Sequence, residues 1–201
     1  KGKIDEDRLY NNLLSSQPLA FNFFGFFKSN HDIALPFLQI IRPDITEILD
    51  VVFEFAPAST KDRSAFDFGF IVRSGKKKGF LGFECKYTDT FSYKNPKTKV
   101  FYGDLDDKKN FQNYYRLFTD NQTRFTDDYF SYIRNPMYNQ LFRNELLAIQ
   151  LNEEKELLGE VLKAKYDFIL TGLFCHHDDV ETIKAGLEFQ KIGRASCRER
   201  V

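Results

Sequence analysis

The sequence contains no tryptophan, one methionine and three cysteines among its 201 residues. Cys85 and Cys175 are widely separated, and so few thiols exclude a disulfide-stapled secreted domain. We therefore expect a reducing, cytoplasmic location. No stretch approaches the roughly 20 apolar residues of a membrane helix and no signal-peptide pattern opens the chain, so no membrane association is expected.

An excess of charge of either sign is also absent. The 29 basic and 29 acidic side chains give a formal net charge of +0, which excludes a strongly basic surface over the whole molecule. A local basic patch remains compatible with this balance. The hydrophobic fraction of 42%, which includes 23 phenylalanines, is enough to build the core of one domain.

The two ends of the chain look artificial. The chain starts at Lys1 without an initiator methionine, and residues 192–201, IGRASCRERV, resemble the translation of a sequencing-adapter oligonucleotide. We interpret 192–201 as a non-native tail; a basic tail that contacts a partner is the alternative. Residues 1–191 are then expected to form a single domain, truncated from a longer reading frame.

The spacing of apolar residues predicts helices and strands in a mixed order. Helical patterns occupy residues 4–16, 30–43, 105–118, 135–151 and 153–165. Strand patterns occupy residues 45–57, 65–73, 79–88 and 166–175. The last run is fully apolar, so we expect a central strand covered on both faces. Together the elements predict an α/β fold in which helices cover a mixed sheet.

The two strands at 65–73 and 79–88 are expected to form a hairpin that carries three charged residues. Because strand side chains alternate between faces, Glu84 and Lys86 share one face, and the Cys85 side chain lies on the other. In the preceding strand the same alternation separates Asp67 from the phenylalanines. Those on the other face are Phe66, Phe68 and Phe70.

The turn of this hairpin decides what lies opposite Asp67. A hairpin folded about Lys76 or Lys77 brings Asp67 opposite Lys86 or Tyr87, to within a residue or two because the turn type is not known. The three charged side chains then converge on one patch at the open end of the hairpin.

Such a patch suits a divalent metal ion. Two carboxylates at close range repel, and a hard ion such as Mg²⁺, for which Mn²⁺ can substitute, neutralises both while keeping sites for water and phosphate. Asp67 and Glu84 are the expected metal ligands, with the peptide carbonyl of Cys85 as a further ligand. Lys86 is expected to orient the attacking water or to stabilise the charge that develops on phosphorus.

Two glycines would give a nucleic-acid backbone access to this patch. Gly69 and Gly82 place no side chain on it. The alternative for the same charged residues is an ion-pair ladder on a wet face, worth about 0–1 kcal/mol. The pattern alone leaves both interpretations open.

Four segments resemble the PD-(D/E)xK nuclease superfamily, most closely a bacterial group of restriction-endonuclease-like proteins. They are SSQPLAFNFFG at 15–25, RSAFDFGF at 63–70, GFLGFECKYTD at 79–89 and NQLFRNELLA at 139–148. The resemblance implies a restriction-endonuclease-like αβββαβ core, with a mixed central sheet of about four strands flanked by helices. It also implies a metal-dependent phosphodiesterase site.

The resemblance assigns roles to the three charged residues. Asp67 is the second-strand acid, and Glu84 and Lys86 are the acid-any-Lys pair. Phe66 stands where the family pattern has proline, a departure common in the superfamily. Gln140, on the following helix, is the candidate for the glutamine that supports the site in several branches.

The remaining polar candidates are less specific. Gln17 and Asn22 belong to the family-like N-terminal segment, where they either cap a turn or lie beside the site, and Glu54 is a candidate extra acid. His176-His177-Asp178-Asp179 has the composition of a metal cluster, but we favour a polar loop that caps the next helix through Asp178. For Lys76 to Lys78 a solubilising turn is favoured over phosphate binding. A Cys85 thiol nucleophile is not expected.

These observations favour a Mg²⁺-dependent endonuclease that hydrolyses phosphodiester bonds, with DNA as the expected nucleic-acid partner. A restriction or defence role is what the resemblance suggests. The alternative is a catalytically inactive nucleic-acid-binding or scaffold domain of the same fold, although a complete Asp-Glu-Lys set argues against it. Because restriction-type enzymes often form homodimers to cut both strands, a homodimer is compatible with this interpretation.

Overall fold

The computed structural model describes residues 6–12, 15–58, 64–87, 120, 125 and 136–192. The helical segments are α1 (Glu6–Asn11), α2 (Ser16–Leu19), the π-helical turn η1 (Ala20–Phe24), α3 (Gly25–Ser29), α4 (His31–Ile41), α7 (Pro136–Glu153), α8 (Val180–Phe189) and the 3₁₀ turn η3 (Gln190–Ile192). The strands are β1 (Glu47–Phe55), β2 (Phe66–Ser74), β3 (Lys77–Lys86), β4 (Lys155–Leu158), β5 (Val161–Ala164) and β6 (Phe168–Cys175). The predicted helix at 105–118 and residues 193–201 of the predicted tail lie outside the described residues.

The main sheet has four strands in the order β1-β2-β3-β6. The pairs β1–β2 and β2–β3 are antiparallel, and β3–β6 is parallel. A parallel pair requires a crossover connection, and α7 lies within it. With α4 ahead of β1, the element order α-β-β-β-α-β confirms the predicted mixed α/β fold.

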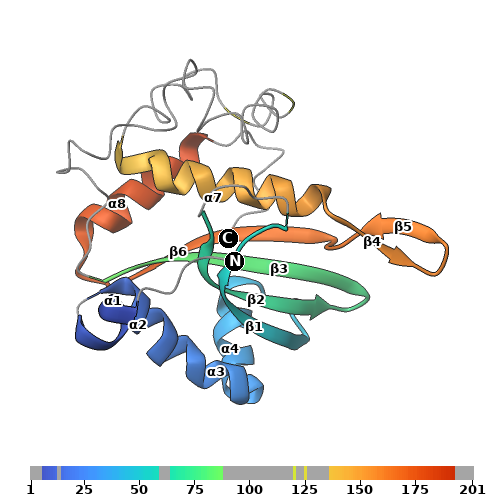
Figure 1. Cartoon of the computed structure of the whole chain (residues 1–201), viewed down its shortest axis with the longest axis horizontal. Helices are drawn as coiled ribbons and strands as arrows, with labels where there is room; N and C mark the ends of the chain where they lie inside the picture. The colour runs from blue at the N-terminus through green and yellow to red at the C-terminus, as the bar shows by residue number, and fades with distance from the viewer. Residues whose placement is uncertain are drawn as a thin grey trace.

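Helices cover both faces of the sheet, as Figure 1 shows, with α7 and α8 above it and α2, α3 and α4 below. The lower core joins Phe24 and Leu38 to Phe68 and Phe70 of β2. The upper core joins Phe80 of β3 to the buried face of α7; its helical members include Leu141, Phe142, Leu146 and Leu147. Along β3, residues of opposite parity therefore serve two separate cores, with Phe80 in the upper one and Leu81 and Phe83 in the lower one.

The helix predicted at 153–165 is wrong, because these residues form the β4–β5 hairpin. Gly159 adopts a φ of +63°, which a two-residue turn accommodates readily. Leu157 pairs with Leu162 and Leu158 with Val161, so the apolar residues that mimic helical spacing are cross-strand neighbours. The hairpin extends beyond one end of the main sheet (Figure 1).

The expectation that residues 166–175 form a central strand is also wrong. Within the described part of the chain, β6 pairs only with β3 and forms an edge of the sheet. All eight of its residues are half-buried, whereas β3 is buried along eight consecutive residues. A fully apolar strand indicates that other elements pack on both faces of the sheet. It does not indicate whether the strand lies at the edge or in the centre of the sheet.

The turn after β6 differs from the prediction by one residue. Asp179, and not Asp178, is the N-cap of α8, and its side chain accepts a hydrogen bond from the Thr182 backbone N–H at 3.0 Å. A cap must be followed by the first helical residue, and α8 begins at Val180.

Candidate active site

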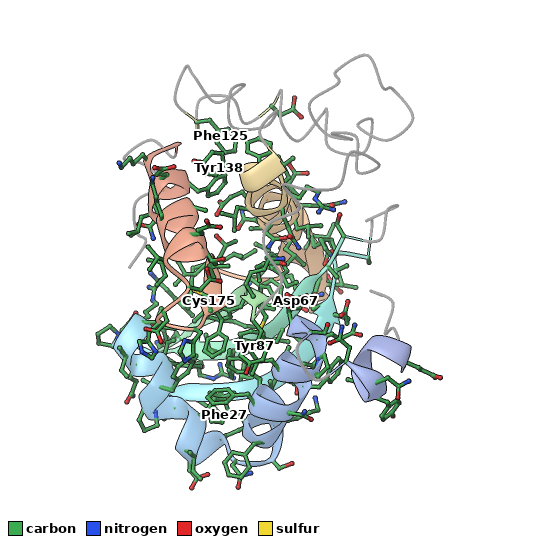
Figure 2. The ribbon with its side chains drawn as sticks, turned by 90° about the vertical axis from the view of Figure 1, so that its left-hand side faces the viewer. Phe27, Asp67, Tyr87, Phe125, Tyr138 and Cys175 are labelled. Carbon is green, nitrogen blue, oxygen red and sulfur yellow. The ribbon has the colours of Figure 1, made fainter. Side chains whose placement is uncertain are left out.

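The charged residues of the hairpin gather where β2 begins and β3 ends. Glu84 and Lys86 are buried, with relative exposures of 2% and 7%, although both are charged side chains that normally face water. Figure 2 labels Asp67, Tyr87 and Cys175, which mark the start of β2, the residue after β3 and the end of β6. All three lie at the same end of the sheet.

The hairpin register differs from the predicted one by two residues. Pairing runs from Ser74 opposite Lys77 to Phe68 opposite Phe83, so the turn consists of Gly75 and Lys76. Gly75 has a φ of +57°, the left-handed conformation that such short turns use. When the centre of a hairpin turn moves by one residue, the partner of every strand residue changes by two residues. Asp67 therefore lies beside Glu84 and Cys85 rather than opposite Lys86 or Tyr87. The Cys85 backbone N–H donates to Asp67 Oδ2 at 2.7 Å.

Glu84 is held by donors from two elements. The Lys86 ammonium lies 2.9 Å from Glu84 Oε1, and the Gln140 side-chain amide donates to the same oxygen. Asn144 Nδ2 donates to Glu84 Oε2 at 3.1 Å. Every one of these groups is a hydrogen-bond donor, so both oxygens of this buried carboxylate have partners inside the fold.

Gln140 connects the acid and the lysine. Its amide nitrogen donates to Glu84, and its carbonyl oxygen accepts from Lys86 Nζ at 2.8 Å. The predicted supporting glutamine therefore lies in contact with both members of the acid-any-Lys pair. One side chain of α7 fixes the relative position of the two.

Asn144 is the site residue that the sequence analysis missed. It lies four residues after Gln140, so both side chains face the sheet from one side of α7. This i, i+4 spacing from the candidate glutamine is the signal that could have identified it. Asn144 is 5% exposed, and the partner named above satisfies its side-chain amide inside the fold.

Asn144→Ala is expected to lower the free energy of unfolding by about 1–3 kcal/mol, because Glu84 Oε2 loses its buried donor. Urea unfolding in metal-free buffer measures this change. Asn152→Ala removes an exposed asparagine from the same helix and is the matched control, with an expected change within about 0.5 kcal/mol. Equal stability of the two variants would contradict the contact with Glu84.

Asp67 is the acid of this group whose ionisation the surroundings oppose. Burial and the neighbouring Glu84 carboxylate raise the pKa of Asp67 well above its ordinary value. The Cys85 N–H and the Lys86 ammonium act in the opposite direction, and Glu54 adds a smaller rise. Two carboxylates withdrawn from water at one place favour either a proton or a cation between them.

Glu54 has an unusual backbone conformation. Its φ is 46°, the only left-handed non-glycine value among the described residues. Gln17 Nε2, from α2, donates to Glu54 Oε1 at 2.8 Å. The extra acid and one glutamine of the N-terminal segment therefore contact each other, whereas Asn22 is exposed on η1.

The expected role of the two glycines is wrong. A Cβ atom at Gly82 would lie 2.7 Å from the Phe66 ring, and one at Gly69 would lie 2.7 Å from the Phe80 ring. Both glycines are buried under phenylalanine, so they give aromatic rings room and leave no path for a nucleic-acid backbone. Phe66 itself packs in the core on the α7 side, not with Phe68 as predicted; its ring lies over Gly82, which has no side chain to exclude it, and edge-on to Phe80.

The other polar candidates lie elsewhere. Cys85 turns its side chain into the lower core, and burial raises the pKa of its thiol, which agrees with the expectation that it is no nucleophile. Lys78 pairs with Glu156 at 3.3 Å. The hairpin tip at Gly75–Lys76 is about 25 Å along the strands from Asp67, by a rise of about 3.3 Å per residue.

A mixed sheet between two helical layers, with an acid on one strand and an acid-any-Lys pair on the next, is the arrangement that the sequence resemblance implied. A family model described as the PD-(D/E)XK nuclease superfamily matches residues 1–196. The chain belongs to this superfamily, as its sequence resemblance implied. No curated protein and no solved structure gave a match. None of the described helices is long and apolar enough to cross a membrane.

Proposed function

We propose that this chain is a divalent-metal-dependent endonuclease that hydrolyses phosphodiester bonds in DNA, with a role in restriction or another defence process. The observation that carries the proposal is the contact network at the end of β3, where Glu84, Lys86 and Gln140 meet beside Asp67. DNA as the substrate and the defence role rest on the resemblance to restriction-endonuclease-like proteins. Membership of the nuclease superfamily supports a nucleic-acid substrate of some kind.

The residues present fit a hard divalent ion. A carboxylate offers about four lone-pair sites, and the described donors to Glu84 occupy three, two on Oε1 and one on Oε2. Asp67 Oδ1 adds a further oxygen, because the Cys85 N–H is bonded to Oδ2. An all-oxygen donor set of this kind suits Mg²⁺ or Mn²⁺, with the Cys85 carbonyl as the proposed third ligand.

When bound, the ion would polarise the phosphodiester and lower the pKa of a bound water. The contribution of the chain is to hold fixed charges in place. Lys86 would orient the attacking water and stabilise the negative charge that develops on the phosphoryl oxygens. Gln140 holds Lys86 and Glu84 in one geometry, so neither has to reorganise as the reaction proceeds.

Asp67→Asn is expected to weaken Mn²⁺ binding by at least about tenfold, because a neutral amide replaces one of two charged ligands. Isothermal titration calorimetry of the full chain with Mn²⁺ and with Mg²⁺ measures the change. Asp50→Asn is the matched control, since Asp50 is a half-exposed acid of β1 that pairs with Lys28 at 3.0 Å. Its affinity for the metal should equal that of the wild type.

The same titration separates the nuclease from an inactive scaffold of the same fold. If the wild type binds neither Mg²⁺ nor Mn²⁺, and Asp67→Asn gives the same result, the enzyme proposal is overturned. Binding that Asp67→Asn abolishes and Asp50→Asn spares supports it.

A further inference from the structure

The turn between β6 and α8 carries three exposed ligand-bearing side chains that the nuclease proposal does not use. They are His176, His177 and Asp178, with side-chain exposures of 52%, 82% and 75%. Since Asp179 makes the helix cap, the carboxylate of Asp178 is not engaged at the α8 N-terminus. It lies instead against both imidazoles.

The side chains of this trio lie close enough together to share one metal ion. Asp178 Oδ1 lies 3.2 Å from His177 Nε2, and Asp178 Oδ2 lies 3.6 Å from His176 Nδ1. One ligand atom from each of the three residues lies within 4.8 Å of the others. Ligand atoms around a tetrahedral Zn²⁺ at 2.0–2.1 Å are about 3.3 Å apart, which is close to the separations of Asp178 from the two imidazoles.

A local hydrogen bond also determines which nitrogen of His176 has a lone pair in the neutral imidazole. The Asp178 backbone N–H donates to His176 Nδ1 at 3.3 Å, so in the neutral imidazole this nitrogen is the unprotonated atom. An unprotonated nitrogen carries the lone pair that a metal ion needs. The bond is long and solvent-exposed, and a metal–nitrogen bond can replace it.

We propose that His176, His177 and Asp178 form a second metal site, selective for borderline divalent ions of the Zn²⁺ class. Two imidazoles and one carboxylate favour Zn²⁺, Co²⁺ or Ni²⁺ over Mg²⁺, whereas the oxygen ligands at Asp67 and Glu84 suit Mg²⁺. Water would complete the coordination. Cys175 belongs to β6 and is half-buried, so it is not counted among the ligands.

The second site lies at the same end of the sheet as the nuclease residues. Cys175 is paired with Lys86, so the His176 backbone is about 6 Å from that of Lys86, by strand spacing and rise. An ion bound there would fasten the end of β6 to the start of α8. This inference does not depend on nuclease activity, and binding to the three residues can be measured without it.

Calorimetric titration of the full chain with Zn²⁺, in buffer without Mg²⁺, tests the site. Removing even an outer-shell partner of a metal ligand costs about 10- to 100-fold in affinity, so His177→Ala and Asp178→Asn should each weaken Zn²⁺ binding by at least about tenfold. Visible absorption of bound Co²⁺ should report tetrahedral coordination in the wild type and be lost in the His176→Ala/His177→Ala double variant.

Three controls keep the result specific. Glu181→Gln removes an exposed carboxylate from the first turn of α8, and it should bind Zn²⁺ as the wild type does if coordination rather than charge is responsible. Asp67→Asn and Cys175→Ser should also retain Zn²⁺ binding. Equal Zn²⁺ affinity in the double histidine variant, or no binding by the wild type up to about 1 mM Zn²⁺, overturns the proposal.

Discussion

Lys86→Ala is expected to lower the rate of Mn²⁺-dependent plasmid nicking by about 10²- to 10³-fold, the usual effect of removing one preorganised charge-stabilising group. Lys86 is 7% exposed and is held between Glu84 Oε1 and Gln140 Oε1. Its ammonium group therefore occupies one position at the site before substrate arrives. Without it, the site loses the group proposed to orient water and stabilise the developing phosphoryl charge.

The control for this variant is Lys78→Ala. Lys78 belongs to the same strand, but it lies near the hairpin tip and pairs with Glu156. Its removal should leave nicking within about twofold of the wild type, as expected for a surface residue far from the chemistry. Glu84→Ala should be as inactive as Lys86→Ala, since Glu84 is a proposed metal ligand. Equal nicking by wild type, Glu84→Ala and Lys86→Ala would mean that the activity is a contaminant or that the site lies elsewhere.

Metal affinity separates a catalytic effect from a structural one. Removing one partner of a buried ion pair destabilises a protein by about 3–5 kcal/mol, so the fold of Lys86→Ala must be checked by circular dichroism. Lys86→Met keeps most of the side-chain volume and provides a second test. If Lys86 acts on water and phosphate, both variants should bind Mn²⁺ at least as tightly as the wild type, because Glu84 loses a competing cation.

Strand alternation predicted which side chains share a face of β3 more reliably than it predicted the hairpin register. The period of two placed Glu84 and Lys86 on one face and the Cys85 side chain on the other, as the structure has them. Register depends on the turn, and either of two adjacent turn centres was compatible with the Gly75 to Gly79 segment. A shift of one residue at the turn moved the neighbour of Asp67 by two residues.

Other features could not be predicted because they depend on packing across the sheet. Sequence alone gives no indication that Phe66 and Phe80 rings cover Gly82 and Gly69, since a glycine in a strand serves ligand access and ring packing equally well. Asn144 becomes recognisable only once Gln140 is placed against Glu84. The β4–β5 hairpin was missed because Leu157, Leu158, Val161 and Leu162 match helical spacing and cross-strand pairing at the same time.

Phe24→Ala is expected to lower the free energy of unfolding by about 3–5 kcal/mol, the usual cost of truncating a buried phenylalanine. Phe24 is fully buried in η1, and its ring stacks on Phe68 of β2 with the centroids 3.5 Å apart. It also meets Phe174 of β6 edge-on at 4.8 Å. One ring thus joins the N-terminal helices to two strands of the sheet, and Phe68 is the residue next to Asp67. At about 2–4 °C per kcal/mol for a chain of this size, the melting temperature should fall by about 6–20 °C.

Phe26→Ala provides the matched comparison, because it removes the same side chain two residues later. Phe26 is 52% exposed on α3, so its truncation leaves little buried space unfilled and should change stability by less than about 1 kcal/mol. Urea and thermal unfolding of both variants measure the difference. A Phe24→Ala protein as stable as Phe26→Ala would show that the N-terminal helices do not pack on β2.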